Sequence, residues 1–487
     1  MEVNAKVINA TKWSAVTEIA AKLIAPFSTI VLARLLTPEA FGVVTTLMMI
    51  ITFVEIFTDA GYQRFIIQHE FTDEQEKYDT ANVAFWSNFV MSLLIWGAIC
   101  IFRDSIAMLV GNPGLGNVIA IACVSIPLAA FSSIQMALYK KDLNFKTLFY
   151  VRIISILIPI FVTIPLAYFL RSYWALVIGT IAINVSNAVI LTYKSKWKPT
   201  FYYSFKRLRE MFSFCSWTVL DTILVWATAY IDIFIVGIVL NEHFLGLYKA
   251  SITTVGQITT LISASVLPVM MPTFSKYQHD LESLRNVLLI FQKYTAIILL
   301  PLGVGIFMFS DLITKLLLGE QWMEAAGFIG IWGLMEVVTI IFSRFCSNVY
   351  PAIGKPNISV IVQILHLIFL LPAIYWSVQY GFTSLYWTRS LMRLQGVVVN
   401  VIFVYIFIKL SFIKLLNNIL PEIIGCLAMF CLGKYLLTLN DDIIMQFFYI
   451  ILCVVTYFSI IICIPQERRI IIPILKIIDE KIKKWIK

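Results

Sequence analysis

Two stretches of the sequence, RLLTPEAFGVV (34–44) and IVLNEHFLGLY (238–248), each end one long apolar run and begin the next. In both, the run ends at a leucine, and the small polar residue that follows can cap the next helix. A glycine comes five residues after that cap, so Gly42 and Gly246 align the two copies. The match predicts an internal repeat, in which a junction between two helices near the start recurs near the middle.

The composition is that of a membrane protein. Of 487 residues, 60% are hydrophobic and 13% are charged, and the mean hydropathy is +0.88. Apolar runs of about twenty residues predict an all-α integral membrane protein of about 14 transmembrane helices, without room for a soluble catalytic domain. We place the spans at 13–35, 40–59, 81–102, 116–138, 147–169, 173–193, 211–239, 243–272, 285–309, 323–350, 357–379, 384–408, 416–438 and 443–464.

The net charge of +9 comes from Lys and Arg in alternate loops, a pattern typical of loops that are kept in the cytoplasm. The basic set includes the loop 194–210 and the tail 465–487, whereas the opposite loops hold little beyond Arg103, Arg171 and Lys315. This alternation predicts that both termini are cytoplasmic, and it argues against nucleic acid as a partner. The tail reads as a basic amphipathic helix on the inner leaflet, or as a frayed end that only reinforces topology.

The repeat and the span count together predict the domain organisation. Six spans precede the basic loop and six follow it in the same orientation, which describes a parallel repeat with a pseudo-twofold axis along the membrane normal. We therefore expect an N-terminal lobe at 1–193, a cytoplasmic linker at 194–210 and a C-terminal lobe at 211–410. Two extra helices at 411–464 and the tail at 465–487 complete the chain.

In its recurring motifs the chain resembles the polysaccharide transporter family, the Wzx-like oligosaccharide flippases of the MOP superfamily, which also holds the MATE multidrug exporters. The motifs are ARLLTPEAFGVV (33–44), the DAG at 59–61 shortly before FIIQ (65–68), and DIFIVGIVLNEHFLGLYKAS (232–251). The resemblance implies a MATE-like fold, with two six-helix lobes around a central cavity and alternating access.

The resemblance also implies a function. The expected cargo is a lipid-linked, anionic oligosaccharide on undecaprenyl pyrophosphate, flipped from the inner to the outer leaflet of a bacterial plasma membrane for capsule, O-antigen or exopolysaccharide synthesis. Membrane lipids and other polysaccharide assembly proteins are the expected partners, and H⁺ or Na⁺ is the candidate coupling ion. One alternative is a MATE-type multidrug exporter. A membrane polysaccharide polymerase is a second, less favoured alternative. A polymerase is disfavoured because the chain lacks a large external loop, so we expect a transporter and not an enzyme.

Two arginines stand where lipid is expected. Arg389 and Arg393 lie four residues apart in span 12, so they share one helix face, and Arg393 lies on the order of 12 Å deep. One hypothesis makes them a cationic wall of the cavity that attracts pyrophosphate or an acidic sugar. The other makes them inter-helix salt bridges, for instance with Glu336 and Asp221.

Other charges within spans leave the same two alternatives. Glu18 and Lys22 are four residues apart, and either neutralise each other or place Lys22 against the cargo. Asp221 and Asp232 are nearly three helical turns apart and share a face. The buried carboxylates could bind a driving ion or pair with an arginine; they are Glu55, Asp221, Asp232 and Glu336.

Arg344 is placed to guard the cavity mouth, whereas Arg152 and Lys293 are expected to reach an interface and stay outside any site. The eight cysteines lie in apolar runs without metal-ligand spacing, and no nucleotide-binding loop, HExxH or CxxC motif occurs. We therefore expect no metal, no cofactor and no catalytic residues.

Overall fold

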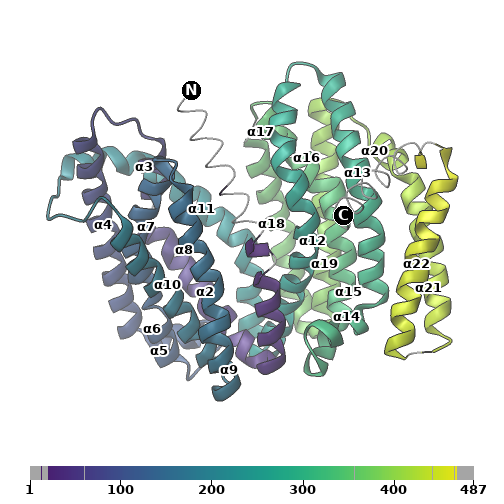
Figure 1. Ribbon diagram of the computed structural model, residues 1–487, viewed down its shortest axis with the longest axis horizontal. Helices are drawn as coiled ribbons and strands as arrows, with labels where there is room; N and C mark the ends of the chain where they lie inside the picture. The colour runs from purple at the N-terminus through teal and green to yellow at the C-terminus, as the bar shows by residue number, and fades with distance from the viewer. Residues whose placement is uncertain are drawn as a thin grey trace, which may run out of the picture. The chain divides into compact units, whose positions relative to one another are not determined.

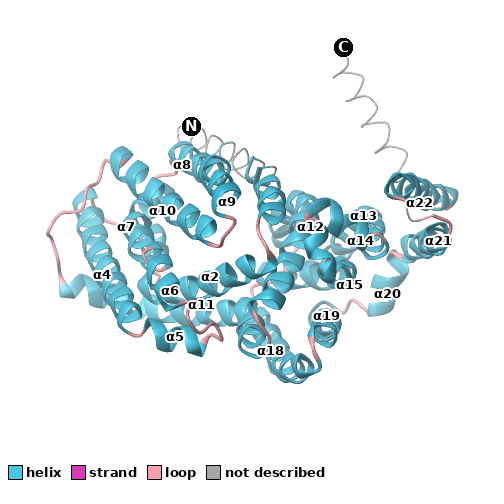
Figure 2. Ribbon diagram, turned by 90° about the horizontal axis from the view of Figure 1, so that it is seen from below, coloured by secondary structure: helices cyan, strands magenta, loops and turns pink. Residues whose placement is uncertain are grey.

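The computed structural model of the protein describes residues 13, 20–22, 24–59, 61–355, 357–440, 442–465 and 467–468. In that part of the chain every regular element is a helix, as Figure 2 shows. The all-α class predicted from hydropathy is therefore confirmed. The predicted tail helix falls almost wholly outside the described residues, and so does Glu18.

The chain divides into two compact units, Met1–Ala250 and Ser251–Lys487, with the boundary inside helix α12 (Glu242–Lys276). The predicted lobes at 1–193 and 211–410, and the separate terminal pair at 411–464, stay predictions. Each unit is described by itself below.

In the first unit, α7 packs against α3, α4 and α10, and α2 packs against α11. Asp73 caps α4, since its carboxylate accepts a hydrogen bond of 2.6 Å from the Glu76 backbone N–H. The helices are α2 (Pro38–Asp59), α3 (Tyr62–Gln68), α4 (Glu74–Ile101), α5 (Arg103–Leu109), α6 (Gly116–Ala122), α7 (Ser125–Lys141), α8 (Phe145–Ile158), π-helix η1 (Pro159–Thr163), α9 (Ile164–Leu170), α10 (Trp174–Lys194) and α11 (Phe205–Val239).

The second unit is built around α13, which packs against α15 and α21, while α21 and α22 lie side by side (Figure 1). Its helices after α12 are α13 (Leu281–Met308), α14 (Ser310–Leu317), 3₁₀-helix η2 (Glu320–Ala325), α15 (Ala326–Thr339), π-helix η3 (Ile340–Arg344), α16 (Phe345–Ser347), α17 (Val349–Ala352), α18 (Asn357–Ser377), 3₁₀-helix η4 (Val378–Tyr380), α19 (Phe382–Ile408), α20 (Phe412–Asn418), α21 (Leu420–Leu437) and α22 (Ile443–Cys463). Apolar side chains from all the long helices form one core.

Among the described residues, 12 helices are long and apolar enough to cross a membrane. They correspond to twelve of the predicted spans, so the protein is a multi-pass membrane protein. The two predicted spans outside this set are 13–35, which lies partly outside the described residues, and 243–272, which lies within α12. The total of fourteen and the cytoplasmic placement of the termini stay predictions.

The repeat glycines have a direct structural role within the first unit. A Cβ atom on Gly42 would lie 1.8 Å from the carbonyl oxygen of Glu242, and one on Gly246 would lie 1.8 Å from that of Pro38. Each repeated glycine is the fifth residue of its helix and lets that helix touch the first residue of the other. Only a residue without a side chain permits this approach, which explains why the sequence repeat aligns on glycine.

The basic linker is packed and partly helical. Trp197 is buried in the core with Phe85, and the Thr200 backbone N–H and hydroxyl both bond the Asn82 side chain, at 3.0 and 2.8 Å. The helix that follows begins at Phe205, six residues before the predicted span at 211. These contacts hold the linker against α4.

Candidate functional site

One buried carboxylate in the second unit, that of Glu336, joins two of the predicted site arginines. Glu336 is buried on α15, and its two oxygens are ion-paired with different arginines. Arg344 Nη2 donates to Glu336 Oε1 at 2.5 Å, and Arg393 of α19 pairs through Nη1 with Oε2. The salt bridge between Arg393 and Glu336 that the sequence offered as one alternative is therefore present. It joins two helices that pack against each other.

A tryptophan completes this cluster. The Trp332 ring is buried one turn before Glu336, and the guanidinium carbons of Arg389 and Arg393 lie 5.2 and 3.7 Å from its centroid. Both arginines therefore lie on one face of α19, as their spacing predicted. The ring's negative face stabilises guanidinium charge in a setting where little water is available.

Arg344 reaches Glu336 because of a local change in helix type. Eight residues of regular α-helix turn about 80° away from the starting face, which would separate the two side chains. The π-helical turn η3 (Ile340–Arg344) takes up one residue more than an α-turn. Because of this extra residue, Arg344 lies close to the position that the seventh residue after Glu336 would take in a regular α-helix. That position is roughly 20° from the face of Glu336. Such turns recur at functional sites.

Exposure separates the members of this cluster, which we name the Glu336 cluster: Trp332, Glu336, Arg344, Arg389 and Arg393. The Arg344 side chain is 44% exposed, whereas Glu336 is buried. A guanidinium has five N–H donors and Glu336 takes one of those of Arg344. Arg344 is thus held in place on one side and open to a further anion on the other.

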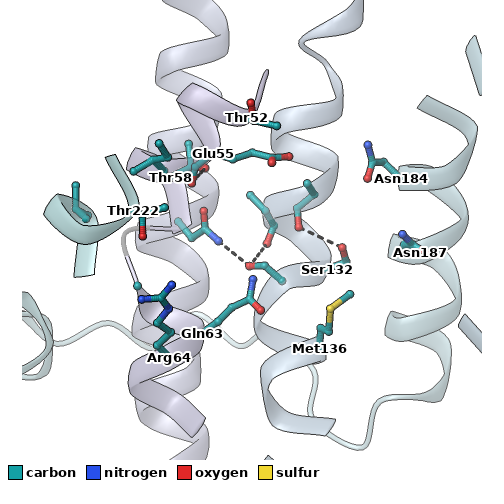
Figure 3. A pocket seen from close by; sticks show the side chains of 17 residues that line it. Thr52, Glu55, Thr58, Gln63, Arg64, Ser132, Met136, Asn184, Asn187 and Thr222 are labelled. Atoms are coloured by element: carbon teal, nitrogen blue, oxygen red, sulfur yellow. Dashed lines mark hydrogen bonds between the residues drawn. The ribbon is translucent and has the colours of Figure 1, made fainter. Parts of the chain in front are cut away.

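The first unit contains a polar pocket with a volume of about 380 Å³ (Figure 3). Figure 3 shows Glu55 extending from α2 toward α7, with Asn184 and Asn187 on α10 across the pocket and Arg64 on its other side. The lining residues are mostly amides and hydroxyls, namely Thr52, Thr58, Gln63, Asn88, Ser132, Ser133, Asn184, Asn187 and Thr222.

Hydrogen bonds hold several of these side chains in fixed positions. The Ser155 hydroxyl donates to Asn187 Oδ1 at 2.6 Å, and Asn88 Nδ2 donates to the Ser133 hydroxyl at 2.7 Å. Such a wall offers both donors and acceptors with one carboxylate and one guanidinium among them, which suits a ligand rich in hydroxyl groups.

The remaining predicted residues are distributed as follows. Asp232 is buried on α11, where its carboxylate accepts hydrogen bonds of 2.8 Å from the Tyr248 hydroxyl and from the Ile233 backbone N–H. Lys22 is half-buried, while Glu18 and the side chain of Asp221 lie outside the described part, so their predicted contacts stay predictions. Among the described residues, the predicted site residues that ion pairs bring together belong to the Glu336 cluster.

The expectation for Lys293 is wrong. Instead of reaching an interface, its ammonium is buried and ion-paired with Glu422 at 3.0 Å and with Glu467 at 2.5 Å.

Sequence reasoning also did not single out Trp332, Arg64 or the asparagines of α10. The signal for those asparagines was available, because Asn184 and Asn187 are three residues apart on one face of an apolar span.

Among the described residues, no group of three His, Cys, Asp or Glu side chains is arranged to hold a metal ion. The described cysteines are free thiols, most of them within apolar packing. In both regions, charged and hydrogen-bonding side chains lie mostly on helices that are long and apolar enough to span a membrane. Polar and ionisable side chains in such helices usually mark a functional site.

The family follows from comparison with known proteins. Residues 31–327 match the family model described as "Polysaccharide biosynthesis protein", and the chain belongs to this family of Wzx-like flippases, with the fold of the MOP superfamily. The family to which the chain belongs is one of membrane transporters rather than of enzymes.

One relative is the succinoglycan biosynthesis transport protein ExoT of Rhizobium meliloti (strain 1021), which is 22% identical over 315 residues. The alignment covers 65% of this chain and 63% of ExoT, so it spans less than two thirds of that relative. Among solved structures, the lipid II flippase MurJ in an inward closed conformation superposes with a TM-score of 0.71 at 16% identity, covering 92% of this chain and 98% of MurJ. An inward-facing MATE multidrug transporter gives 0.59 at 14% identity, covering 80% and 94%. These likenesses support the predicted MOP fold.

Proposed function

We propose that the protein flips a lipid-linked, anionic oligosaccharide from the inner to the outer leaflet by alternating access, with undecaprenyl pyrophosphate as the carrier lipid. The observation that carries the proposal is the half-exposed Arg344, which the buried Glu336 holds within a spanning segment. A guanidinium fixed in this way can bind a phosphate or a sugar carboxylate through its remaining donors.

The polar pocket of the first unit supplies the other half of the required chemistry. Its amide and hydroxyl groups match the donors and acceptors of sugar hydroxyls, and its volume of about 380 Å³ lies in the range of small-molecule sites. Glu55 and Arg64 add one charge of each sign, so the pocket does not favour a cation over an anion. This composition fits a neutral or weakly charged sugar.

Membership of a family that acts in polysaccharide biosynthesis supports this cargo, and ExoT, a transport protein of succinoglycan biosynthesis, is a relative with a named glycan. A bacterial plasma membrane, with both termini in the cytoplasm, is the location that goes with it. Coupling to H⁺ or Na⁺ and contact with other polysaccharide assembly proteins belong to the same proposal. The MATE-type exporter remains the alternative, since a MATE transporter shares the fold.

The test replaces Arg344 by Gln in cells whose only copy of the gene is the variant. We expect surface polysaccharide to fall by about 10- to 100-fold, because the variant loses one hydrogen bond from a charged donor to the cargo. The lipid-linked precursor should accumulate inside the cell. Arg344 is preferred over Arg393, because its side chain is 44% exposed and that of Arg393 only 15%, so a glutamine at 344 disturbs the packing less.

The matched control is Arg103→Gln, since the Arg103 side chain is 45% exposed and is paired with its neighbour Asp104. This variant should leave polysaccharide unchanged. Normal polysaccharide with Arg344→Gln, at normal protein level in the membrane, would refute the assignment. Loss of ethidium efflux on gene deletion, with polysaccharide intact, would favour the exporter.

A further inference from the structure

A second cluster of charges lies in the second unit, where α13, α21 and the segment after α22 meet. The Lys293 ammonium is 3.0 Å from Glu422 Oε1 and 3.1 Å from Oε2, and 2.5 Å from Glu467 Oε1. It also donates to the backbone carbonyl of Asn418 at 2.7 Å. An ammonium has three protons, so these three partners use all of them. We name Lys293, Glu422 and Glu467 the Lys293 cluster.

All three side chains of the Lys293 cluster are buried. The exposed fraction is 9% for Lys293, 0% for Glu422 and 1% for Glu467. Two ionised carboxylates and one ammonium leave one negative charge in excess. An uncompensated charge at such depth costs several kcal/mol, so the folded state favours the uptake of one positive charge.

Oxygen atoms are available for that charge. In the described part of the chain, Glu467 Oε2 is buried without a hydrogen bond, and Glu422 Oε1 has no hydrogen-bond donor in proper geometry although Lys293 lies near it. Buried polar atoms are nearly always satisfied. These two oxygens therefore indicate a ligand that brings a proton or a positive charge.

A recess gives access to the cluster. It has a volume of about 540 Å³, and Lys293 and Glu467 line it together with Asn286, Asn417 and Asn418. Water and small ions can therefore reach Lys293 and Glu467 although both side chains are covered. The amide side chains on the wall would supply further oxygen ligands to a cation.

Among the described residues, neighbouring groups do not supply the missing charge. Cys426 on α21 and Tyr457 on α22 lie near the carboxylates, and Tyr294 lines the recess. All three are neutral acids at pH 7, and the Tyr457 hydroxyl donates to the Ile297 carbonyl at 2.9 Å. On α15, Glu336 is already paired with Arg344 and Arg393. Arg285 of α13 donates to the Ile408 carbonyl, and Arg468, which follows α22, is exposed.

We propose that the Lys293 cluster binds one monovalent cation, either a proton shared by the two carboxylates or a sodium ion. The bound charge balances the cluster and so stabilises the packing of the terminal helices α21 and α22 on α13. Phe307 and Phe430 stack across the same seam, with centroids 6.3 Å apart. This proposal does not depend on the identity of the cargo, because its readout is stability.

The experiment measures the melting temperature of the purified protein in detergent between about pH 5 and pH 8, with NaCl or with N-methylglucamine chloride. Glutamate in the unfolded chain releases its proton near pH 4, so a proton held only in the folded state adds stability above that pH. This stability is lost as the pH rises through the range. For a proton, the melting temperature should fall by at least about 2–4 °C in both salts. For sodium, NaCl should raise it by a similar amount at the highest pH.

Either result supports the site and tells the two cations apart. Glu422→Gln and Glu467→Gln each balance the cluster with a neutral side chain of the same shape, so both should flatten the pH and sodium dependence. The two variants are independent, so one that fails to fold leaves the other. Glu320→Gln is the control, because its exposed carboxylate is paired with Lys315 at 2.7 Å; it should follow the wild type. A wild type without pH or sodium dependence, or a dependence that survives in both variants, would overturn the proposal.

Discussion

The second unit contains two clusters of ion pairs with opposite composition. The Glu336 cluster sets two arginines on one carboxylate and a third, Arg389, over the Trp332 ring, and one of the paired arginines, Arg344, is 44% exposed. The Lys293 cluster sets two carboxylates around one ammonium, and all three side chains are buried. The first therefore leaves part of its positive charge exposed on Arg344. The second keeps its excess negative charge on covered side chains, beside a recess that Lys293 and Glu467 line.

This difference indicates that two properties of a charge cluster together determine which ligand it binds. They are the sign of its excess charge and the exposure of the side chains that carry that charge. A half-exposed guanidinium can keep its charge in water until an anionic group replaces that water. An excess carboxylate that is buried has no water to stabilise its charge. A proton or another cation must therefore neutralise it within the folded state. The two clusters should consequently respond to mutation through different readouts, transport for one and stability for the other.

The largest effect on stability is expected from Lys293→Met. Methionine fills a similar volume but leaves two buried carboxylates without their ammonium, and breaking a buried pair in this way costs about 3–5 kcal/mol. We expect a corresponding loss in the free energy of unfolding, measured by denaturant titration in micelles. Part of the loss should be recovered toward pH 5, where the carboxylates can take up protons.

Lys315→Met provides the comparison for this variant. Lys315 and Glu320 form an exposed pair, with side chains 42% and 77% exposed, and such pairs contribute about 0–1 kcal/mol. If both variants lose the same stability, then the Lys293 cluster is energetically no different from a surface pair.

A smaller effect on stability is expected from Glu336→Gln. The amide keeps an acceptor for Arg344 but loses the charge, and a hydrogen bond to a charged group contributes about 1.5–3 kcal/mol. The cost should stay below that of Lys293→Met, because Arg344 can turn to water. Surface polysaccharide should fall as well, although less than with Arg344→Gln, since the guanidinium is still present but no longer held. Stability unchanged within error would show that Glu336 does not anchor the arginines.

Much of the fold follows from sequence periodicity, whereas the charge partners mostly do not. Apolar runs of the right length predict twelve of the spanning helices seen in the structure, because burial of a whole helix in lipid needs only composition and length. Spacing also predicts that Arg389 and Arg393 share a face. The pairing of Arg344 with Glu336 depends on a π-turn, and that of Lys293 with Glu422 on contacts between residues far apart in sequence. Neither pairing produces a residue spacing that could be recognised in the sequence.

The smallest effect is expected from Trp332→Phe, which tests whether the Glu336 cluster acts as one unit. Phenylalanine is a weaker partner for the guanidinium 3.7 Å away, and cation–π contacts contribute about 0.5–2 kcal/mol. The same arginine, Arg393, is also paired with Glu336. If ring and carboxylate together fix its position, then Trp332→Phe combined with Glu336→Gln should deviate from additivity by at least about 0.5 kcal/mol in the free energy of unfolding. Additive losses would mean that the ring only fills space and that the carboxylate alone holds the arginine; coupled losses would mean that the cluster orders its cations before any cargo arrives.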